Sequence, residues 1–445
     1  MIRFILATFA SFFLAGSATA AVEIEEVTSP GGFKAWLVEE HSIPFGAIEI
    51  RFKGGASLDP EGKRGVINLM TGLIEEGAGD LDAQAFIRAR DELAASFGFK
   101  VYDDALSVSA RFLTENRDEA IGLLRQALVN PRFDDQAIER VRAQVLSMIR
   151  SGETDPNAMA GRAFNSLAFG SHPYGSSEDG TLESVQALTR DDIVAAHQSV
   201  LVQDRVYVGA AGDITAEELG FIMDRLLGDL PASGPPLPGD VSVGLTGGVT
   251  LVPFETPQSV ALFGHVGIAR DDPDFFPAFL ANEIFGGSGL QSRLSEEVRE
   301  KRGLTYGVGT YLANYEHADL LIGQLASAND RVGEAIDVVR AEWERIANGG
   351  VTEEELEETK TYLTGAYPLR FDGNGTIARI MVGMQVSGLT PDYITTRNDK
   401  VNAVTLEDIK RVAARIYQPD SLRFVIVGQP DGIEEVNLGG NGPNE

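Results

Sequence analysis

Cysteine is absent from this chain of 445 residues, so neither disulfides nor thiolate ligands and nucleophiles are available to it. Histidine is scarce as well, because only five occur and no two are close in sequence. They are His41, His172, His197, His265 and His317. Since zinc sites take their ligands from Cys, His, Asp and Glu, this distribution excludes the usual motifs with closely spaced His or Cys.

Positive charge is also in short supply. Lys and Arg together number 37 against 66 Asp and Glu, which leaves a formal net charge of −29. A surface this acidic repels nucleic acid and anionic lipid, and the sequence has no basic patch to compensate, so we expect no nucleic-acid partner. The acidity keeps the protein soluble, and it would also attract basic, unfolded peptides; both explanations stay open.

Beyond its N-terminus the chain has no long apolar run. Residues 1–20 have the pattern of a secretory signal, with Arg3 before an apolar stretch and Ala-Thr-Ala at 18–20 as the cleavage site. The alternative, a membrane anchor, is disfavoured because the run is short for a bilayer span and no second one follows. We expect export to the periplasm, with secretion as second choice, and no membrane span in the mature chain. Loss of Arg3 gives the mature chain a charge of −29 − 1 = −30.

The length predicts more than one domain, and 43% hydrophobic with 23% charged residues is typical of a globular protein. A segment rich in Pro and Gly begins at Pro231 and predicts a linker over 231–248. Residues 21–230 and 249–435 are then two domains, and 436–445 form a flexible tail.

The two predicted domains look alike. In each, a Thr-x-x-Asp helix start is followed by an Asp, an apolar strand and a Gly. Four residue pairs share one offset of 216: Thr189 and Thr405, Asp192 and Asp408, Asp204 and Asp420, Gly212 and Gly428. Four gapless matches indicate an internal duplication. Apolar residues recur at helical spacing over 118–128, 134–150, 331–346 and 353–367, and they alternate with polar residues over 48–52 as in a half-buried strand. Strands and long helices occur without a regular βαβ rhythm, which predicts an α+β class in which helices cover a mostly antiparallel sheet.

The segment 294–306, Leu-Ser-Glu-Glu-Val-Arg-Glu-Lys-Arg-Gly-Leu-Thr-Tyr, resembles the C-terminal-half signature of the M16 metallopeptidases, the pitrilysin, insulinase and mitochondrial processing peptidase relatives. The resemblance extends from about 22 to about 428 and implies two similar domains facing one another across a cleft. In that family an Arg, here Arg299, and a Tyr seven residues later, here Tyr306, reach toward a zinc site. We expect Arg299 near the C-terminal end of a helix and Tyr306 on the strand that follows the turn at Gly303. A Tyr hydroxyl can donate a hydrogen bond to the developing oxyanion, and Arg can position the peptide. Without the resemblance, an ordinary solvated helix face and a strand aromatic would explain both residues.

The zinc motif of the family, His-x-x-Glu-His on a helix of the N-terminal half, has lost its residues here. By the resemblance the helix occupies 66–77, and Asn68 and Gly72 stand where the two His belong, with Thr71 in place of the Glu. The third ligand, a Glu about 75 residues further on, corresponds by count to Met148. None of these four can act as zinc ligand or base, so we expect no metal on this chain.

Two functions of different class remain open. The first is the zinc-free subunit of a heteromeric peptidase, in which a homologous partner with His-x-x-Glu-His supplies zinc and this chain supplies Arg299 and Tyr306 to an extended peptide substrate. The alternative is a non-catalytic peptide-binding or scaffold protein derived from M16 peptidases. A peptidase active by itself with an unusual metal site is disfavoured, because no other ligand cluster occurs.

Overall fold

The computed structural model describes residues 23–287 and 292–437. The predicted signal peptide and most of the predicted tail lie outside these ranges. Each half of the chain forms a six-stranded sheet. The N-terminal sheet, in the order β1-β2-β8-β3-β7-β6, consists of β1 Glu25–Thr28, β2 Lys34–Glu39, β3 Phe45–Lys53, β6 Ser96–Tyr102, β7 Ala105–Leu113 and β8 Val206–Gly212. The C-terminal sheet, in the order β11-β12-β10-β13-β9-β14, consists of β9 Gly248–Pro253, β10 Gln258–Val266, β11 Val308–Asn314, β12 Asp319–Ala328, β13 Arg423–Gly428 and β14 Val436–Asn437.

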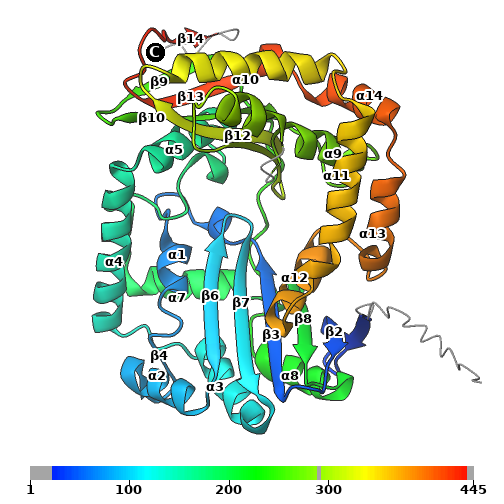
Figure 1. Cartoon of the computed structure of the whole chain (residues 1–445). Coiled ribbons are helices and arrows are strands. Elements are labelled where there is room, and N and C mark those ends of the chain that lie inside the picture. The colour runs from blue at the N-terminus through cyan, green and yellow to red at the C-terminus, as the bar shows by residue number, and fades with distance from the viewer. Residues whose placement is uncertain (1–22, 288–291, 438–445) are drawn as a thin grey trace, which may run out of the picture.

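Helices surround both sheets (Figure 1). Those of the first half are α1 Val66–Thr71, α2 Ala83–Glu92, α3 Arg117–Val129, α4 Asp135–Glu153, α5 Pro156–Phe169, α6 Leu182–Ala187, α7 Arg190–Val200 and α8 Ala216–Leu227, with short 3-10 turns η1 Ala56–Leu58, η2 Thr114–Asn116, η3 Pro173–Gly175 and η4 Gln203–Arg205 and a small hairpin of β4 Gly77–Ala78 and β5 Leu81–Asp82. Those of the second half are α9 Phe275–Gly286, the π-helical turn η5 Ser295–Glu300, α10 Val332–Ala347, α11 Glu353–Ala366, α12 Asn374–Val386, α13 Tyr393–Asn402 and α14 Leu406–Ile416, with 3-10 turns η6 Pro368–Arg370 and η7 Pro419–Ser421.

The two sheets have the same topology over five strands. In the first, β8 lies parallel to β2 and antiparallel to β3, and β7 then separates β3 from β6. In the second, β13 lies parallel to β9 and antiparallel to β10, and β12 separates β10 from β11. Only the outermost strand differs, because β1 precedes β2 along the chain whereas β14 follows β13. The predicted α+β class with mostly antiparallel sheets is confirmed.

The two copies of the Thr-x-x-Asp motif adopt the same local structure. Thr189 and Thr405 are the N-caps of α7 and α14, and each forms a capping box with the Asp three residues later. These reciprocal hydrogen bonds satisfy backbone N–H groups that a helix leaves free at its start. An apolar side chain four residues after the cap, Ile193 or Ile409, is fully buried in the core of its own half.

Each half contributes one helix to the other half's sheet. Helix α5 of the first half packs on β10 and β13, where Ala160 and Phe164 join two apolar clusters with side chains of the second sheet. Helix α12 of the second half packs on β8, β3 and β2, and its Met381 and Met384 lie with Trp36 and Ala211. We call α5 and α12 the exchanged helices.

The seat of α12 on the first sheet requires a small residue beneath it. A Cβ on Gly209 of β8 would stand 2.6 Å from the carbonyl oxygen of Ala378, so only glycine admits the helix backbone this close. Further along, the Gln385 side-chain amide donates a 2.8 Å hydrogen bond to the Val208 carbonyl. The first sheet is therefore covered on one face by its own helices and on part of the other by a helix from the second half.

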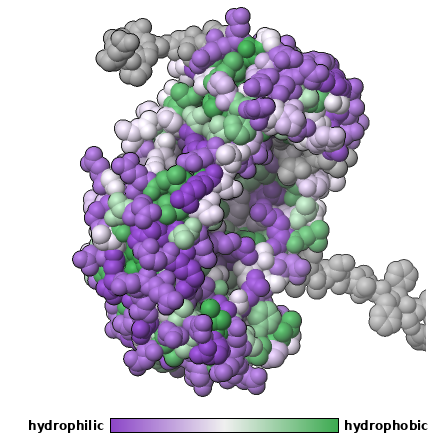
Figure 2. Space-filling model, turned by 90° about the vertical axis from the view of Figure 1, so that its left-hand side faces the viewer, coloured by the Kyte–Doolittle hydropathy of each residue, from purple (hydrophilic) through white to green (hydrophobic). Residues whose placement is uncertain are grey.

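The two halves enclose a hollow, visible in the space-filling view (Figure 2). The segment between α8 and β9 that joins them contains no helix or strand. It is nevertheless attached to the protein, because Val241 N–H donates to the His317 carbonyl at 3.0 Å and Gly244 N–H to the Ala168 carbonyl at 2.8 Å. The predicted arrangement, two similar domains facing one another, is confirmed. Within residues 23–287 and 292–437, no helix has the length and apolarity needed to cross a bilayer.

Candidate functional site

The helix predicted to carry the zinc motif is short. We predicted it over 66–77, but α1 ends at Thr71, and residues 72–75 form a turn. Gly72, in place of the second His, lies at the C-cap of α1. Glycine lowers helix stability by about 1 kcal/mol relative to Ala, so its presence favours a helix end at this residue. The predicted helix length was therefore wrong, and the motif position lies partly outside the helix.

The side chains at the motif positions are engaged within the chain. The Asn68 amide donates a 2.9 Å hydrogen bond to the Asp179 carboxylate. The buried Thr71 hydroxyl donates to the Ile67 carbonyl at 2.7 Å. Gly72 has no side chain. None of the three is placed to bind a metal or to activate a water molecule.

Met148, which the count assigned to the position of the third ligand, lies on α4. A Cβ on Gly72 would stand 3.0 Å from the Cγ1 of Val141, which is buried in the core. Met148 lies seven residues further along α4, about 10 Å at the helical rise, and 54% of it is exposed. Val141 has no metal-binding atom either, and among the described residues no group of three or more His, Asp or Glu could hold a metal ion.

Acidic side chains gather at the start of α1. The Asp59 carboxylate accepts hydrogen bonds from the N–H groups of Gly65 and Ile67 at 2.7 and 2.9 Å. Arg64 forms ion pairs with Asp59 at 3.2 Å and with Asp103 at 3.1 Å. We call Asp59, Arg64, Asp103, Glu178 and Asp179 the acidic cluster.

The pKa values in the acidic cluster are raised mainly by burial. Burial raises the pKa of Asp59 to about 6 despite its two backbone hydrogen bonds and Arg64. Burial, assisted by the charges of Asp103 and Asp179, raises the pKa of Glu178 to about 7. The members of this cluster are spread over 120 residues and converge only in the fold, so no local sequence pattern predicts it. The nearest distinctive segment is His-Pro-Tyr-Gly at 172–175, just before Glu178.

Arg299 and Tyr306 lie on either side of a tight turn in the second half. Arg299 is near the end of η5, as predicted, and its carbonyl accepts from the Gly303 N–H at 2.8 Å. Gly303 has φ +59°, a conformation that favours glycine, so the chain reverses there. The Arg299 side chain is 37% exposed and lies 3.4 Å from the Glu300 carboxylate.

Tyr306 is 90% exposed, which is exceptional for an aromatic side chain. We predicted it on a strand, but it lies in a bend two residues before β11, which begins at Val308. Its backbone is held by the neighbouring Thr305, whose hydroxyl donates to the Ala326 carbonyl at 2.7 Å. The aromatic ring is thus displayed from a fixed backbone with almost no contact to its own chain.

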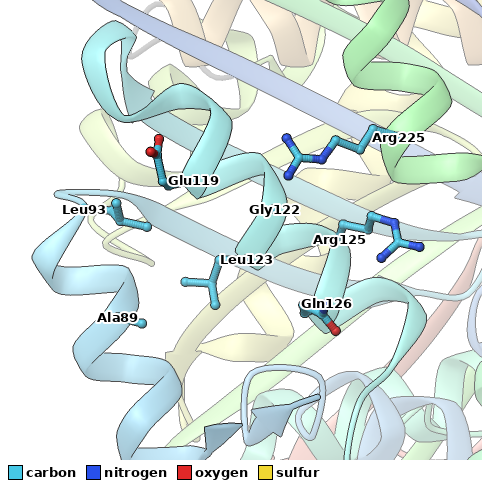
Figure 3. A pocket seen from close by; sticks show the side chains of 8 residues that line it. All are labelled: Ala89, Leu93, Glu119, Gly122, Leu123, Arg125, Gln126 and Arg225. Atoms are coloured by element: carbon cyan, nitrogen blue, oxygen red, sulfur yellow. The ribbon is translucent and has the colours of Figure 1, made fainter. Parts of the chain in front are cut away.

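A separate surface pocket lies among α2, α3 and α8 (Figure 3). It is lined by Ala89, Leu93, Glu119, Gly122, Leu123, Arg125, Gln126 and Arg225. Its two guanidinium groups are engaged, because Arg125 pairs with Asp229 and Arg225 donates to the Asp118 carbonyl at 3.0 Å. The pocket lies on helices that cover the first sheet, not beside the motif positions, and we assign it no function.

Two similar α+β halves around a hollow, with non-ligands at the metal position, define a metallopeptidase-type scaffold that has lost its own metal-binding residues. Residues 35–181 match the family model described as insulinase (peptidase family M16), and residues 187–363 match the model described as peptidase M16 inactive domain. The chain belongs to peptidase family M16.

Similar proteins include both named non-peptidases and named proteases. A protein of Helicobacter pylori called "Non-peptidase homolog YmxG" is 25% identical over 415 residues, covering 93% of this chain and 95% of that protein. An "Uncharacterized zinc protease YmxG" of Bacillus subtilis is 22% identical, covering 89% of this chain and 96% of that protein. The crystal structure of a peptidase M16 inactive domain from Pseudomonas fluorescens superposes with a TM-score of 0.84 at 24% identity, covering 94% of this chain and all of that one. At these identities the superposition shows the fold alone.

Proposed function

We propose that this chain is the zinc-free subunit of a two-chain M16-type peptidase. The observation that supports the proposal is the contrast between its halves: the motif positions of α1 are occupied by non-ligands, while Tyr306 of the second half is 90% exposed with nothing of its own chain upon it. A tyrosine hydroxyl that is exposed in this way is free to donate a hydrogen bond to a substrate held by a partner chain, as the proposal requires.

The partner in this proposal is a homologous chain with an intact His-x-x-Glu-His motif. It would supply zinc, which activates the attacking water, and the Glu that accepts its proton. This chain would supply the Tyr306 hydroxyl, which donates to the oxyanion forming on the scissile carbonyl, and Arg299, which binds a substrate carbonyl or carboxylate. Both chains would act in the periplasm after export.

The substrate would bind as an extended peptide. Two edge strands, β6 in the first sheet and β11 in the second, are each paired on one side only within the described residues. Such edges offer free N–H and C=O groups to an added strand. Tyr306 immediately precedes β11, so a peptide along that edge would pass beside its hydroxyl.

The test is co-expression of this chain with a homologue that carries His-x-x-Glu-His, encoded beside it or in the same genome. We expect cleavage of an unfolded peptide by the mixture and by neither chain alone. Tyr306→Phe should lower kcat by about 10²–10³-fold, the usual effect of losing one oxyanion donor. Tyr362→Phe, another exposed tyrosine of the second half, is the matched control and should leave the rate unchanged.

Folding and metal content are checked on the same samples. Tyr306→Phe should change the free energy of unfolding by less than about 0.5 kcal/mol, because the side chain is almost fully exposed. Zinc should appear in the complex and be undetectable in this chain alone after dialysis. Cleavage that persists undiminished in the Tyr306→Phe complex, or stoichiometric zinc in this chain alone, would refute the proposal.

The second candidate is a non-catalytic peptide-binding or scaffold protein. It is supported by the name of the Helicobacter pylori relative and by the fold shared with a subunit of complex III from Candida albicans, with a TM-score of 0.75 at 16% identity. A stable complex with the zinc-bearing homologue that never cleaves peptide, with either wild-type chain or Tyr306→Phe, would favour this candidate.

A further inference from the structure

The first sheet has one face that its own helices leave open. Along β3, side chains alternate between the core, with Ile48, Ile50 and Phe52, and the opposite face, with Glu49 and Arg51. The exchanged helix α12 covers this second face over β8, β3 and β2. Helix α12 reaches only part of β7, and β6 carries no helix on that side (Figure 1). We call the side chains of β3, β7 and β6 on this side the open face.

The open face is cationic, although the whole chain is strongly acidic. Arg51, Lys100 and Arg111 come from the three strands, and Arg379 projects from the neighbouring α12. We call these four residues the cationic floor. Among the described residues, Lys100, Arg111 and Arg379 are exposed and have no ion-pair partner; Arg51 donates to the Ser107 hydroxyl at 3.0 Å. The sequence predicted no basic patch, but the fold assembles one from cations up to 328 positions apart (379 − 51).

Negative charge on the open face is limited and buried. Glu49 is 6% exposed and lies 3.9 Å from Arg51. Burial raises the pKa of Glu49, while Arg51, Arg379 and Lys100 act to lower it. Lys53, at the end of β3, is neutralised by Glu316 at 2.6 Å and is left out of the floor. One buried carboxylate of the open face, Glu49, therefore lies among four cations.

The strand register sets the spacing of the floor. In the strand register, Lys100 of β6 lies opposite Ser107 of β7, and Ser107 lies opposite Arg51 of β3. Lys100 and Arg51 therefore lie in one row across the strands. Arg111 lies in a second row, four residues along β7 from Ser107, or about 13 Å at the rise of a strand. The row between them carries Glu49, Ser109 and Gly98. Glu49 is buried at the β3 end of this row, and the small Ser109 and Gly98 leave room above β7 and β6.

We propose that the cationic floor binds extended peptide segments that carry two carboxylates four residues apart. In an extended chain, residues i and i+4 point to the same side and are about 13 Å apart, which matches the two rows. Charge complementarity selects Asp and Glu, and the acidic cluster beyond the β6–β7 turn repels longer polyanions such as nucleic acid. This proposal names a substrate class for the proposed peptidase subunit. Only the cleavage of the bound peptide rests on the proposed function, because binding needs neither the partner nor zinc.

The test uses the full mature chain alone and labelled ten-residue peptides of Ser, Thr and Val, with binding followed by fluorescence anisotropy. One peptide carries Glu at i and i+4, a second carries Glu at i and i+3, and a third carries Lys at i and i+4. We expect the first peptide to bind about tenfold more tightly than either of the others at low salt, with the advantage lost at 0.5 M salt.

Substitutions in the cationic floor test whether the peptide binds there. Lys100→Gln and Arg111→Gln should each remove most of the preference for the first peptide, whereas Arg88→Gln, an exposed cation on α2, should leave it unchanged. Equal affinity for the Glu and Lys peptides, or a preference that survives both floor variants, overturns the inference. The measurement is binding to the isolated chain, so an absence of cleavage with the partner would not contradict this inference. An absence of binding would not contradict the proposed peptidase subunit, which is tested separately by cleavage.

Discussion

The two halves have the same five-strand topology but differ at the element that follows their central strand. After β3 the first half forms α1, six residues long, which ends where the family motif would continue. After β10 the second half forms α9, twelve residues long and almost entirely buried. The first half keeps its sheet and loses its metal residues, and the second keeps a displayed tyrosine. The difference shows that the fold depends on buried strands and helix caps, which both halves retain, and not on the residues of the metal motif.

The largest expected effect tests whether the halves are separable. Phe164→Ala in α5 and Met381→Ala in α12 each remove a fully buried side chain at the opposite half's sheet. The first should lower the free energy of unfolding by about 3–5 kcal/mol and the second by about 2–5 kcal/mol. Calorimetry should show one transition that moves down in both variants, because each exchanged helix belongs to both cores. Leu167→Ala, partly exposed on α5, is the control and should cost far less. Two independent transitions, with only one shifted, would contradict this coupling.

A smaller effect contrasts the carboxylates of the halves. In the folded state Glu178 of the first half has a pKa raised to about 7, so its protonated form stabilises the protein, and this stability is lost as pH rises from about 4.5 through 7. In the second half, Arg415 and Arg411 lower the pKa values of Asp272 and Asp274, which contributes stability that is lost as pH falls through those lowered values.

Glu178→Gln should therefore stabilise the protein by about 1–2 kcal/mol at pH 8, after allowance for solvent screening, and by nothing measurable at pH 4. Asp274→Asn should destabilise it at pH 7, and this effect should shrink as the pH falls through the lowered pKa of Asp274. Thermal unfolding across this pH range measures both, with Glu61→Gln, an exposed loop residue, as control. A Glu178→Gln variant that is less stable at pH 8 would show that the carboxylate, and not its neutral form, is favoured in the fold.

The smallest effect tests the equivalence of the repeated helices. Thr189→Ala and Thr405→Ala should each cost about 1 kcal/mol, because each removes one capping-box hydrogen bond to the helix start. Urea unfolding should give costs that agree within about 0.5 kcal/mol. A neutral effect for one threonine would show that its helix start is held by other contacts, such as the ion pair of Lys63 with Asp192.

The sequence predicted those features that depend on local patterns. The helical periods over 118–128 and 331–346 correspond to α3 and α10, and the alternation at 48–52 lies within β3. The offset of 216 found both capping boxes. Features that depend on tertiary packing were mispredicted: α1 ends early, and Tyr306 lies before its strand.

The acidic cluster and the cationic floor could not be predicted from the sequence. Both join residues from separate strands, loops and helices, and no local composition distinguishes them. Only strand register brings Lys100 and Arg51 into one row, and only the packing of α12 adds Arg379.

The exchange of α5 and α12 has a consequence for ancestry. If the chain arose by doubling of a shorter gene, the single-length protein would have exposed the apolar surface that its sister's helix now covers. Two identical copies could have satisfied that need by trading the helix symmetrically, as domain-swapped dimers do. Fusion would then have tied together a pair that was already mutually dependent, which left one copy free to lose its metal residues without unfolding.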